Sequence, residues 1–392
     1  TVRIVAALAE KFCTFEGRKT LSMKKYLVTG GAGFIGANFV KYIAGRYGRE
    51  CEIVILDKLT YAGHVENIAE ELKLPNVRLV VGDICDRNLV ETLLDSFDPN
   101  YIVNFAAESH VDRSISDPRP FLETNIMGTQ NLLECARNAW ATPEERFTNG
   151  KFFLQISTDE VYGSLERTLE TPVPLILDGA AGLVANGRSD MKTFGEGLFT
   201  EDTPLAPRSP YSASKASADM MTLAYSHTYG FPAAVTRCSN NYGPLQFPEK
   251  LIPRTISRIL AGEKIPVFAQ GKNVRDWLYV EDHCRAIDDV LTYGHAGEIF
   301  NIGGFNEEQN IDVVRRIINS VRSLVKSDKR YRELSALPPE KIDYSLIEFV
   351  KDRPGHDMRY AIDPSKIATT RSWTPSTPFE TGILKTVKWC MD

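Results

Sequence analysis

Residues 26–36 read YLVTGGAGFIG, a short apolar stretch that runs directly into glycines at positions 30, 33 and 36. This spacing meets the steric requirements of a strand that turns tightly into a helix. Gly30 permits the turn, Gly33 lets a phosphate group approach the start of the helix, and Gly36 lets the helix pack closely on the strand. The motif predicts a strand–turn–helix unit whose turn can hold a nucleotide phosphate.

The sequence around this motif alternates between strand and helix. Fully apolar strands separated by helical periodicity belong in a parallel sheet that is covered on both faces. The strands are expected over 26–29, 52–56, 77–81, 101–105, 152–157 and 233–237, and the helices from Phe34 and over 87–96 and 121–139. The fold class predicted is α/β, with a doubly wound parallel-sheet (Rossmann) domain.

Beyond this domain the alternation loosens, and we expect a smaller C-terminal α/β domain that binds the substrate. The expected organisation is an N-terminal extension or cloning remnant over 1–22, a nucleotide-binding domain over 23–237 to which 270–293 returns, and a substrate domain over 238–392 that includes a strand at 298–302.

A long loop and one helix suggest roles in closure or assembly. Residues 164–209 show no sustained period of either kind, so we expect a loop that serves either as a lid or as an oligomer contact. Helix 121–139 carries an apolar stripe of Ile126, Leu132, Leu133 and Ala136, which could pack against a second subunit or against its own sheet. The sequence leaves both choices open.

Composition excludes several classes of protein. The 46 basic and 51 acidic residues give a net charge of −5 without long blocks of one sign, which argues against a nucleic-acid partner. No apolar run reaches the roughly 18 residues needed to span a membrane, and the start of the chain does not resemble a secretory signal. The seven cysteines form no CxxC pair, so we expect reduced thiols, no metal site and a cytoplasmic location.

Acidic residues at two strand ends indicate which nucleotide is bound. Asp57 ends the second strand, 21 residues beyond Gly36, where a carboxylate can accept both hydroxyls of an adenosine ribose. This favours NAD over NADP, although Lys58 beside it weakens the preference, and Asp57 could instead only cap a loop. Asp83 and Ile84 end the third strand, where an adenine would lie.

Two further segments place chemically active side chains near this site. Tyr211 and Lys215 lie four residues apart on a helix that starts at Pro210, and a cation beside a phenol lowers the phenol's pKa toward the range of a useful base. Thr158, Asp159 and Glu160 follow an apolar strand at the edge where such sheets bind ligands. The two adjacent carboxyl groups can divide acid and base roles if their pKa values differ.

Four motifs together carry a family resemblance. TGGAGFIG (29–36), AAESHVDRS (106–114), STDEVYG (157–163) and SPYSASK (209–215) resemble the extended short-chain dehydrogenase/reductase (NAD-dependent epimerase/dehydratase) family. The Asp–Glu pair makes the likeness strongest to its nucleotide-sugar dehydratases. The loop 164–209 is longer and richer in glycine than in the family that the motifs resemble. The resemblance therefore gives no expectation of how the cleft closes in this chain.

The resemblance implies a lyase mechanism with NAD as cofactor and dTDP-glucose as substrate. Tyr211, supported by Lys215 and Thr158, would remove the proton of the 4-hydroxyl while carbon 4 loses hydride to NAD. Glu160 would remove the proton on carbon 5, Asp159 would protonate the departing 6-hydroxyl, and the hydride would return to carbon 6. The family's dimers imply a homodimer.

The same resemblance extends the expected binding sites. The cofactor set comprises Gly30, Gly33, Phe34, Ile35, Gly36, Asp57, Lys58, Thr60, Asp83, Ile84, Ala106, Ala107, Ser109, Thr124, Tyr211 and Lys215. The substrate set comprises His110, Thr158, Asn240, Lys250, Leu251, Arg275, Asn310, Arg353 and His356. Asn240 and Arg275 offer the amide and guanidinium groups that suit a diphosphate, though a turn and a surface ion pair would explain them equally simply.

Other functions remain open on the sequence alone. A dehydratase of UDP- or GDP-sugars, or a nucleotide-sugar 4-epimerase, would keep Tyr211 and Lys215. A redox-sensing regulator would keep the nucleotide-binding domain but would have no need of the tyrosine–lysine pair or the two carboxyl groups.

Overall fold

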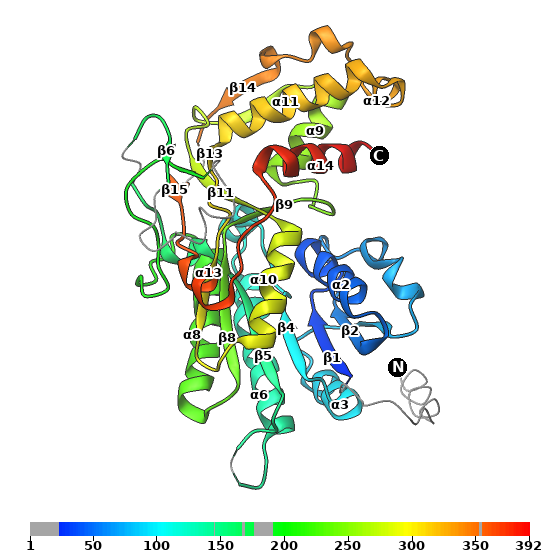
Figure 1. Cartoon of the computed structure of the whole chain (residues 1–392), viewed down its shortest axis with the longest axis vertical. Coiled ribbons are helices and arrows are strands. Elements are labelled where there is room, and N and C mark those ends of the chain that lie inside the picture. Colours follow the sequence, from blue (N-terminus) through cyan, green and yellow to red (C-terminus); the bar gives the residue numbers. More distant parts are fainter. Residues whose placement is uncertain (1–22, 145, 167–168, 176–190, 353–354) are drawn as a thin grey trace.

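The computed structural model describes residues 23–392 except for 145, 167–168, 176–190 and 353–354. The expectation for the segment 1–22 falls outside the described residues. The chain forms two lobes, with the elements α9, α11, α12 and α14 gathered in the upper one and the large sheet in the lower one (Figure 1).

A seven-stranded sheet, parallel throughout, forms the centre of the larger lobe. Its strand order is β12-β8-β5-β4-β1-β2-β3, so the chain moves outward from β1 first in one direction and then in the other. The strands are β1 (Lys24–Thr29), β2 (Cys51–Asp57), β3 (Val77–Val81), β4 (Tyr101–Asn104), β5 (Phe152–Thr158), β8 (Ala233–Cys238) and β12 (Ile299–Ile302). The predicted doubly wound fold is confirmed.

Helices cover both faces of this sheet and bury its apolar side chains. One face packs against α2 (Phe34–Tyr47) and α10 (Val280–Tyr293), through side chains such as Phe39 and Ile287. The other face packs against α3 (Arg87–Phe97), α6 (Thr129–Trp140) and α8 (Pro210–Tyr229). Strands buried on both faces explain the uninterrupted apolar runs in the sequence.

One expectation about these elements needs correction. The strand expected at 298–302 was assigned to the substrate domain, but β12 pairs in parallel with β8 and forms the edge of the large sheet. Of the stripe on the expected helix 121–139, for which the sequence left two choices open, Leu132, Leu133 and Ala136 are fully buried against their own sheet, and Ile126 is partly buried. That helical segment also contains a π-helical part, η4 (Leu122–Gly128), between α5 (Arg119–Phe121) and α6.

The smaller lobe is built from short strands and three amphipathic helices around a second core. Strand β11 (Val274–Tyr279) is its centre and pairs with β9 (Asn240–Tyr242), β13 (Glu307–Gln309) and β15 (Arg359–Tyr360). The remaining elements are β10 (Ile265–Phe268), β14 (Ile347–Val350), α9 (Leu251–Ala261), α11 (Asn310–Ser327), α12 (Lys329–Leu334) and α14 (Phe379–Met391). Helix α13 (Ser365–Arg371) instead packs against β12 and α10, with Ile367 in the core of the larger lobe. No helix in the described ranges is long and apolar enough to cross a membrane.

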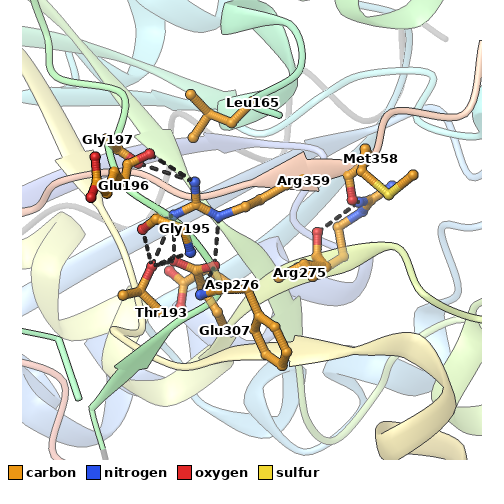
Figure 2. Close-up of polar contacts among 12 residues, drawn as sticks. Leu165, Thr193, Gly195, Glu196, Gly197, Arg275, Asp276, Glu307, Met358 and Arg359 are labelled. Atoms are coloured by element: carbon orange, nitrogen blue, oxygen red, sulfur yellow. Dashed lines mark hydrogen bonds and ion pairs between the residues drawn. The ribbon is translucent and has the colours of Figure 1, made fainter. Parts of the chain in front are cut away.

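The described ends of the long loop are fastened to the smaller lobe. Leu165 donates its backbone N–H to the carbonyl of Arg359, 2.9 Å away, as the loop leaves the larger lobe. On the returning side, which includes β7 (Lys192–Thr193), the Arg359 guanidinium donates to the Thr193 hydroxyl and to carbonyl groups of residues 195–197 (Figure 2). Arg359 is held in turn by Glu307, whose carboxylate accepts two of its N–H groups at 2.7 and 2.8 Å.

This buried ion pair should matter for stability because both members are almost inaccessible to water. We expect Arg359→Met to lower the free energy of unfolding by about 3–5 kcal/mol, since Glu307 would be left as an unpaired buried charge. The double variant Arg359→Met/Glu307→Gln should lose less than Arg359→Met alone. Urea unfolding would measure both, with Arg254→Met on the exposed surface of α9 as the control. Equal stability of wild type and Arg359→Met would contradict this role.

Candidate active site

A cavity of about 310 Å³ opens where the carboxyl ends of the central strands meet the smaller lobe. This is the edge at which doubly wound sheets bind ligands. All sixteen residues of the expected cofactor set line it, as do the five expected catalytic residues. The structure therefore brings together segments that lie up to 185 positions apart in the chain, from Gly30 to Lys215.

The glycine turn forms the floor of the cavity and leaves no space for larger side chains. Gly30 has a φ of +66°, and a Cβ atom on it would lie 2.6 Å from the backbone nitrogen of Ala106. A Cβ atom on Gly36 would lie 2.3 Å from the carbonyl oxygen of Gly30. Helix α2 starts directly after Gly33, with no acidic residue in its first turn, so its backbone N–H groups and dipole favour a phosphate.

The two charged residues at the end of β2 have distinct partners. The Asp57 carboxylate accepts the backbone N–H groups of Ala32 and Leu59 at 2.9 and 2.8 Å, so it orders the glycine turn while it lines the cavity. Lys58 forms an ion pair of 2.6 Å with Asp83. Because the lysine is already paired with a carboxylate, it weakens the NAD preference less than its position in the sequence indicated.

Helix α8 presents the tyrosine–lysine pair to the cavity. Ser209 and Ser212 form a reciprocal capping box, and Pro210 occupies the first turn, which fixes where this helix begins. Lys215 is buried and donates its Nζ to the carbonyl oxygen of Ile156, 2.6 Å away at the end of β5. Tyr211 is buried beside it, near the Thr158 hydroxyl.

Lys215 was expected to lower the pKa of the Tyr211 phenol, but the burial of the phenol opposes this effect. Burial raises the pKa of Tyr211 well above its ordinary value, and the nearby charge of Glu160 raises it further, against a hydrogen bond with Thr158 that lowers it. Burial of the phenol thus opposes the lowering of its pKa that was expected from Lys215. Burial also lowers the pKa of Lys215, which weakens the cation on which that prediction relied.

The two adjacent carboxyl groups are in different environments. Asp159 is 1% exposed, and its Oδ2 has no hydrogen-bond partner within the described structure. Burial raises the pKa of Asp159 well above its usual range, and the charges of Glu160 and Asp276 add to this against Arg275. Asp159 is thus suited to carry a proton at neutral pH, while Glu160 is only partly buried.

Several polar atoms that face the cavity are buried without a partner, which suits a site built for a polar ligand. In the described part of the chain these atoms include Asp159 Oδ2, Asn240 Oδ1 and Gln246 Oε1. A buried polar group without a hydrogen bond costs free energy, so these atoms are better satisfied when a ligand is present. Together with the glycine turn and Asp57, they fit a dinucleotide and a hydroxyl-rich substrate.

The expected substrate residues divide into two groups. Thr158, Asn240 and Lys250 line the cavity. His110, Leu251, Arg275, Asn310 and His356 are not among its lining residues, and Arg353 falls outside the described residues. The Arg275 guanidinium donates to the carbonyl groups of Val274, Asp357 and Met358 (Figure 2) and lies 4.2 Å above the Tyr360 ring. Contact of this second group with substrate stays a prediction.

Other lining residues were not expected from the sequence. They are Leu56, Ala62, Gly63, Gly82, Phe105, Glu108, Ile156, Ser157, Cys238, Ser239, Asn241, Gln246, Phe247 and Glu249. Cys238 ends β8 and Ser239 follows it, at the edge of the sheet where strand ends carry ligands. Gln246, Phe247 and Glu249 lie in a loop between β9 and α9, for which neither periodicity nor composition gives a signal.

The fold and the site together define the class of protein. A doubly wound sheet with a glycine turn for a dinucleotide, a buried tyrosine–lysine pair and two carboxyl groups of different burial is the equipment of a nucleotide-dependent enzyme that moves protons and hydride on a bound substrate.

The comparisons with known proteins name the family. The model of the NAD dependent epimerase/dehydratase family matches residues 26–303, and the chain belongs to this family. It is 46% identical to dTDP-glucose 4,6-dehydratase 1 of Escherichia coli over 365 residues, which are 93% of this chain and 92% of that protein.

Two solved structures of the same kind match nearly the whole chain. The dTDP-glucose 4,6-dehydratase of Bacillus anthracis in complex with NAD is 43% identical with a TM-score of 0.73, and the alignment covers 93% of this chain and 96% of that one. DesIV of Streptomyces venezuelae, a dTDP-glucose 4,6-dehydratase with NAD and a dTDP ligand bound, is 40% identical with a TM-score of 0.75 at the same coverage.

The raised pKa of Asp159 predicts how stability depends on pH. The folded state keeps this proton at pH values where the unfolded chain has lost it, so the carboxyl group lowers stability as pH rises from about 4 toward its folded pKa, by about 1.4 kcal/mol per pH unit. Asp159→Asn removes this penalty.

We therefore expect the unfolding free energy of Asp159→Asn, relative to wild type, to increase between pH 5.5 and pH 8. Urea unfolding at several pH values would measure it. Asp95→Asn, on the exposed surface of α3, should give a constant difference and serves as the control. A constant difference for Asp159→Asn would show that this carboxyl group ionises normally.

Proposed function

We propose that this enzyme is an NAD-dependent hydro-lyase that converts dTDP-glucose into dTDP-4-keto-6-deoxy-glucose, the reaction of dTDP-glucose 4,6-dehydratases. The observation that carries the proposal is the pair Asp159 and Glu160, one fully buried and one partly buried, beside the tyrosine–lysine pair in one cavity. The relatives named for this reaction match the chain along most of its length. The product is a precursor for deoxysugars of the rhamnose type.

The protein's own groups divide the proton transfers. Tyr211 removes the proton of the 4-hydroxyl, with Thr158 within hydrogen-bond reach and Lys215 fixed against Ile156. The ketone formed at carbon 4 makes the hydrogen on carbon 5 acidic. Glu160 removes it as a proton and returns a proton to carbon 5 once hydride has been added at carbon 6. Asp159, protonated because of its burial, donates its proton to the departing 6-hydroxyl, which leaves as water.

The cofactor accounts for the remaining chemistry. When bound, NAD stores the hydride that leaves carbon 4 and returns at carbon 6, and its cationic ring lowers the pKa of a nearby phenol. Gly30, Gly33 and the start of α2 would hold its pyrophosphate, Asp57 its ribose, and Asp83 with Ile84 would lie at its adenine. Lys250 and Asn240 are the cavity residues placed to contact the nucleotide part of the substrate.

The acid and base roles can be separated by following two events. We expect Glu160→Gln and Asp159→Asn each to slow formation of the dehydrated product about 10²–10⁴-fold, which is the usual contribution of a positioned acid or base. Mass spectrometry of the nucleotide sugar would show loss of one water with wild type. In D₂O, Asp159→Asn should still exchange the carbon-5 hydrogen, whereas Glu160→Gln should not.

Controls and alternatives are tested in the same assay. Glu263→Gln and Asp95→Asn, both on exposed surface, should turn over like wild type. UDP- and GDP-sugars in place of dTDP-glucose test the runner-up dehydratase activities. A product that has changed configuration without losing water would identify a 4-epimerase and refute the proposed reaction, and no turnover of any nucleotide sugar would favour a regulator.

We also propose that the enzyme works as a homodimer in the cytoplasm. Large apolar side chains are exposed on neighbouring helical elements of the larger lobe: Ile115 on α4 (Val111–Ser116), Leu122 and Met127 on η4, and Met220 on α8. Surfaces of this kind mark protein contacts. The six described cysteines are free thiols, as is usual for cytoplasmic proteins.

Charges placed on this surface should prevent assembly without unfolding the chain. We expect Met127→Lys/Met220→Lys to shift the protein from dimer to monomer in light-scattering chromatography, because two buried cations would face each other across the interface. The matched control is Met358→Lys, an exposed methionine of the smaller lobe. A wild-type monomer, or a variant that stays dimeric, would contradict the proposed surface.

A further inference from the structure

One loop of the smaller lobe lies along the cavity and contacts the larger lobe at several points. This loop, residues 244–250, which we call the strap, joins β9 to α9 and supplies four lining residues, Gln246, Phe247, Glu249 and Lys250. Lining residues Thr60, Ala62 and Gly63 come from the larger lobe and belong to the segment after β2. The cavity is therefore bounded here by two loops from different lobes.

The first end of the strap is anchored beside the nucleotide helix. Asn38 of α2 donates its side-chain N–H to the carbonyl of Pro244 at 2.9 Å. Leu245 packs against the core of the larger lobe and has a φ of +69°, a conformation that costs free energy for a residue with a side chain. The surroundings must hold this backbone in place, so the strap's entry point is fixed.

The middle of the strap is held by an aromatic contact. The Phe247 ring lies 5.9 Å from the His64 ring in a stacked arrangement and 5.7 Å from the Tyr61 ring, edge to face. His64 and Asn67 both donate to the carbonyl of Ala32 in the glycine turn, at 3.1 and 2.8 Å. Phe247 thus links the smaller lobe to the loop that is itself fastened to the phosphate-binding turn.

The far end of the strap is held by charge. Glu249 lies 3.5 Å from the Arg113 guanidinium and 3.6 Å from His110, and Arg113 lies 3.7 Å above the Tyr61 ring. Lys250 donates its Nζ to the carbonyl of Ser109 at 3.2 Å. His64 and Arg113 are exposed, so these contacts stand at the surface and can break without disturbing either core.

We propose that the strap retains NAD, with Phe247 and Glu249 holding the cavity closed over the cofactor between turnovers. The inference rests on the proposed function, in which the hydride taken from carbon 4 returns at carbon 6 and the cofactor needs no exchange. Retention is then an advantage, whereas an enzyme that consumes NAD must release it every cycle. The contacts of Phe247 and Glu249 with the larger lobe would have to open for the cofactor to leave.

The test measures cofactor exchange directly. Purified enzyme is loaded with isotopically labelled NAD, chased with an excess of unlabelled NAD, and sampled for retained label. We expect Phe247→Ala to exchange about tenfold faster than wild type, since two ring contacts are lost, and Glu249→Gln and Arg113→Gln about threefold faster, since these pairs are partly exposed. Phe247→Tyr, which keeps the ring, should exchange at a rate close to wild type.

A second readout separates retention from general damage. The activity of Phe247→Ala should fall when the protein is diluted without NAD and should return when NAD is added, whereas a folding defect would not respond to NAD. Phe349→Ala removes an exposed phenylalanine of β14 and is the matched control, with exchange as in wild type.

The outcomes decide between the claims. Exchange at the wild-type rate in both Phe247→Ala and Arg113→Gln would overturn the inference. If Phe247→Ala does not fold, Arg113→Gln decides alone, because it acts from the exposed surface of the other lobe. Failure of wild type to bind labelled NAD at all would instead overturn the proposed cofactor, and the inference with it.

Discussion

The close approach of three backbone segments at the end of β1 is the constraint on which the site depends. At Gly30 the chain lies against Ala106, which follows β4, and at Gly36 the helix lies against Gly30 itself. A Cβ atom at either position would lie 2.6 or 2.3 Å from a backbone atom, so α2 or the segment after β4 would have to move. The same contact sets the helix start, the path of residues 105–109 and the edge of the cavity where Asp57 lies. Cofactor binding and sheet packing therefore both require residues without a side chain at these two positions.

A second constraint is the cost of burying carboxyl groups where the lobes meet. Asp159, directly after β5, and Asp276 of β11 lie in a dry site where burial raises the pKa of both, and the charge of Asp276 raises that of Asp159 further. Asp276 receives backbone N–H groups of Gly304 and Asn306 at 2.7 Å each, whereas Asp159 Oδ2 receives none within the described structure. The uneven supply of donors leaves Asp159 as the group that keeps a proton. The acid role proposed for Asp159 thus rests on the hydrogen bonds that its carboxyl group lacks.

From the sequence we could predict the features that depend on residues close together in the chain. The glycine spacing, the capped helix start before Tyr211 and the strand ends near Asp57 and Thr158 each follow from residues within a few positions of one another. The sequence did not predict what depends on distant segments: β12 joined the large sheet because β8 offered a free parallel edge, and the pKa of Tyr211 reflects burial by two lobes more than the nearby lysine. Phe247 was missed because its partners, Tyr61 and His64, lie more than 180 positions away.

The contacts around the Arg359–Glu307 pair and those of the strap differ in how far they exclude water. The Arg359–Glu307 pair is buried, ties the described ends of the long loop to the smaller lobe, and leaves no water to replace its hydrogen bonds if it opens. That part of the loop is consequently held against the smaller lobe, and the choice between a lid and an oligomer contact stays open. The strap is held at the surface, where water can replace each lost contact, so its opening costs less. If the lobes part to exchange a ligand, separation at the strap is the path of lower free energy.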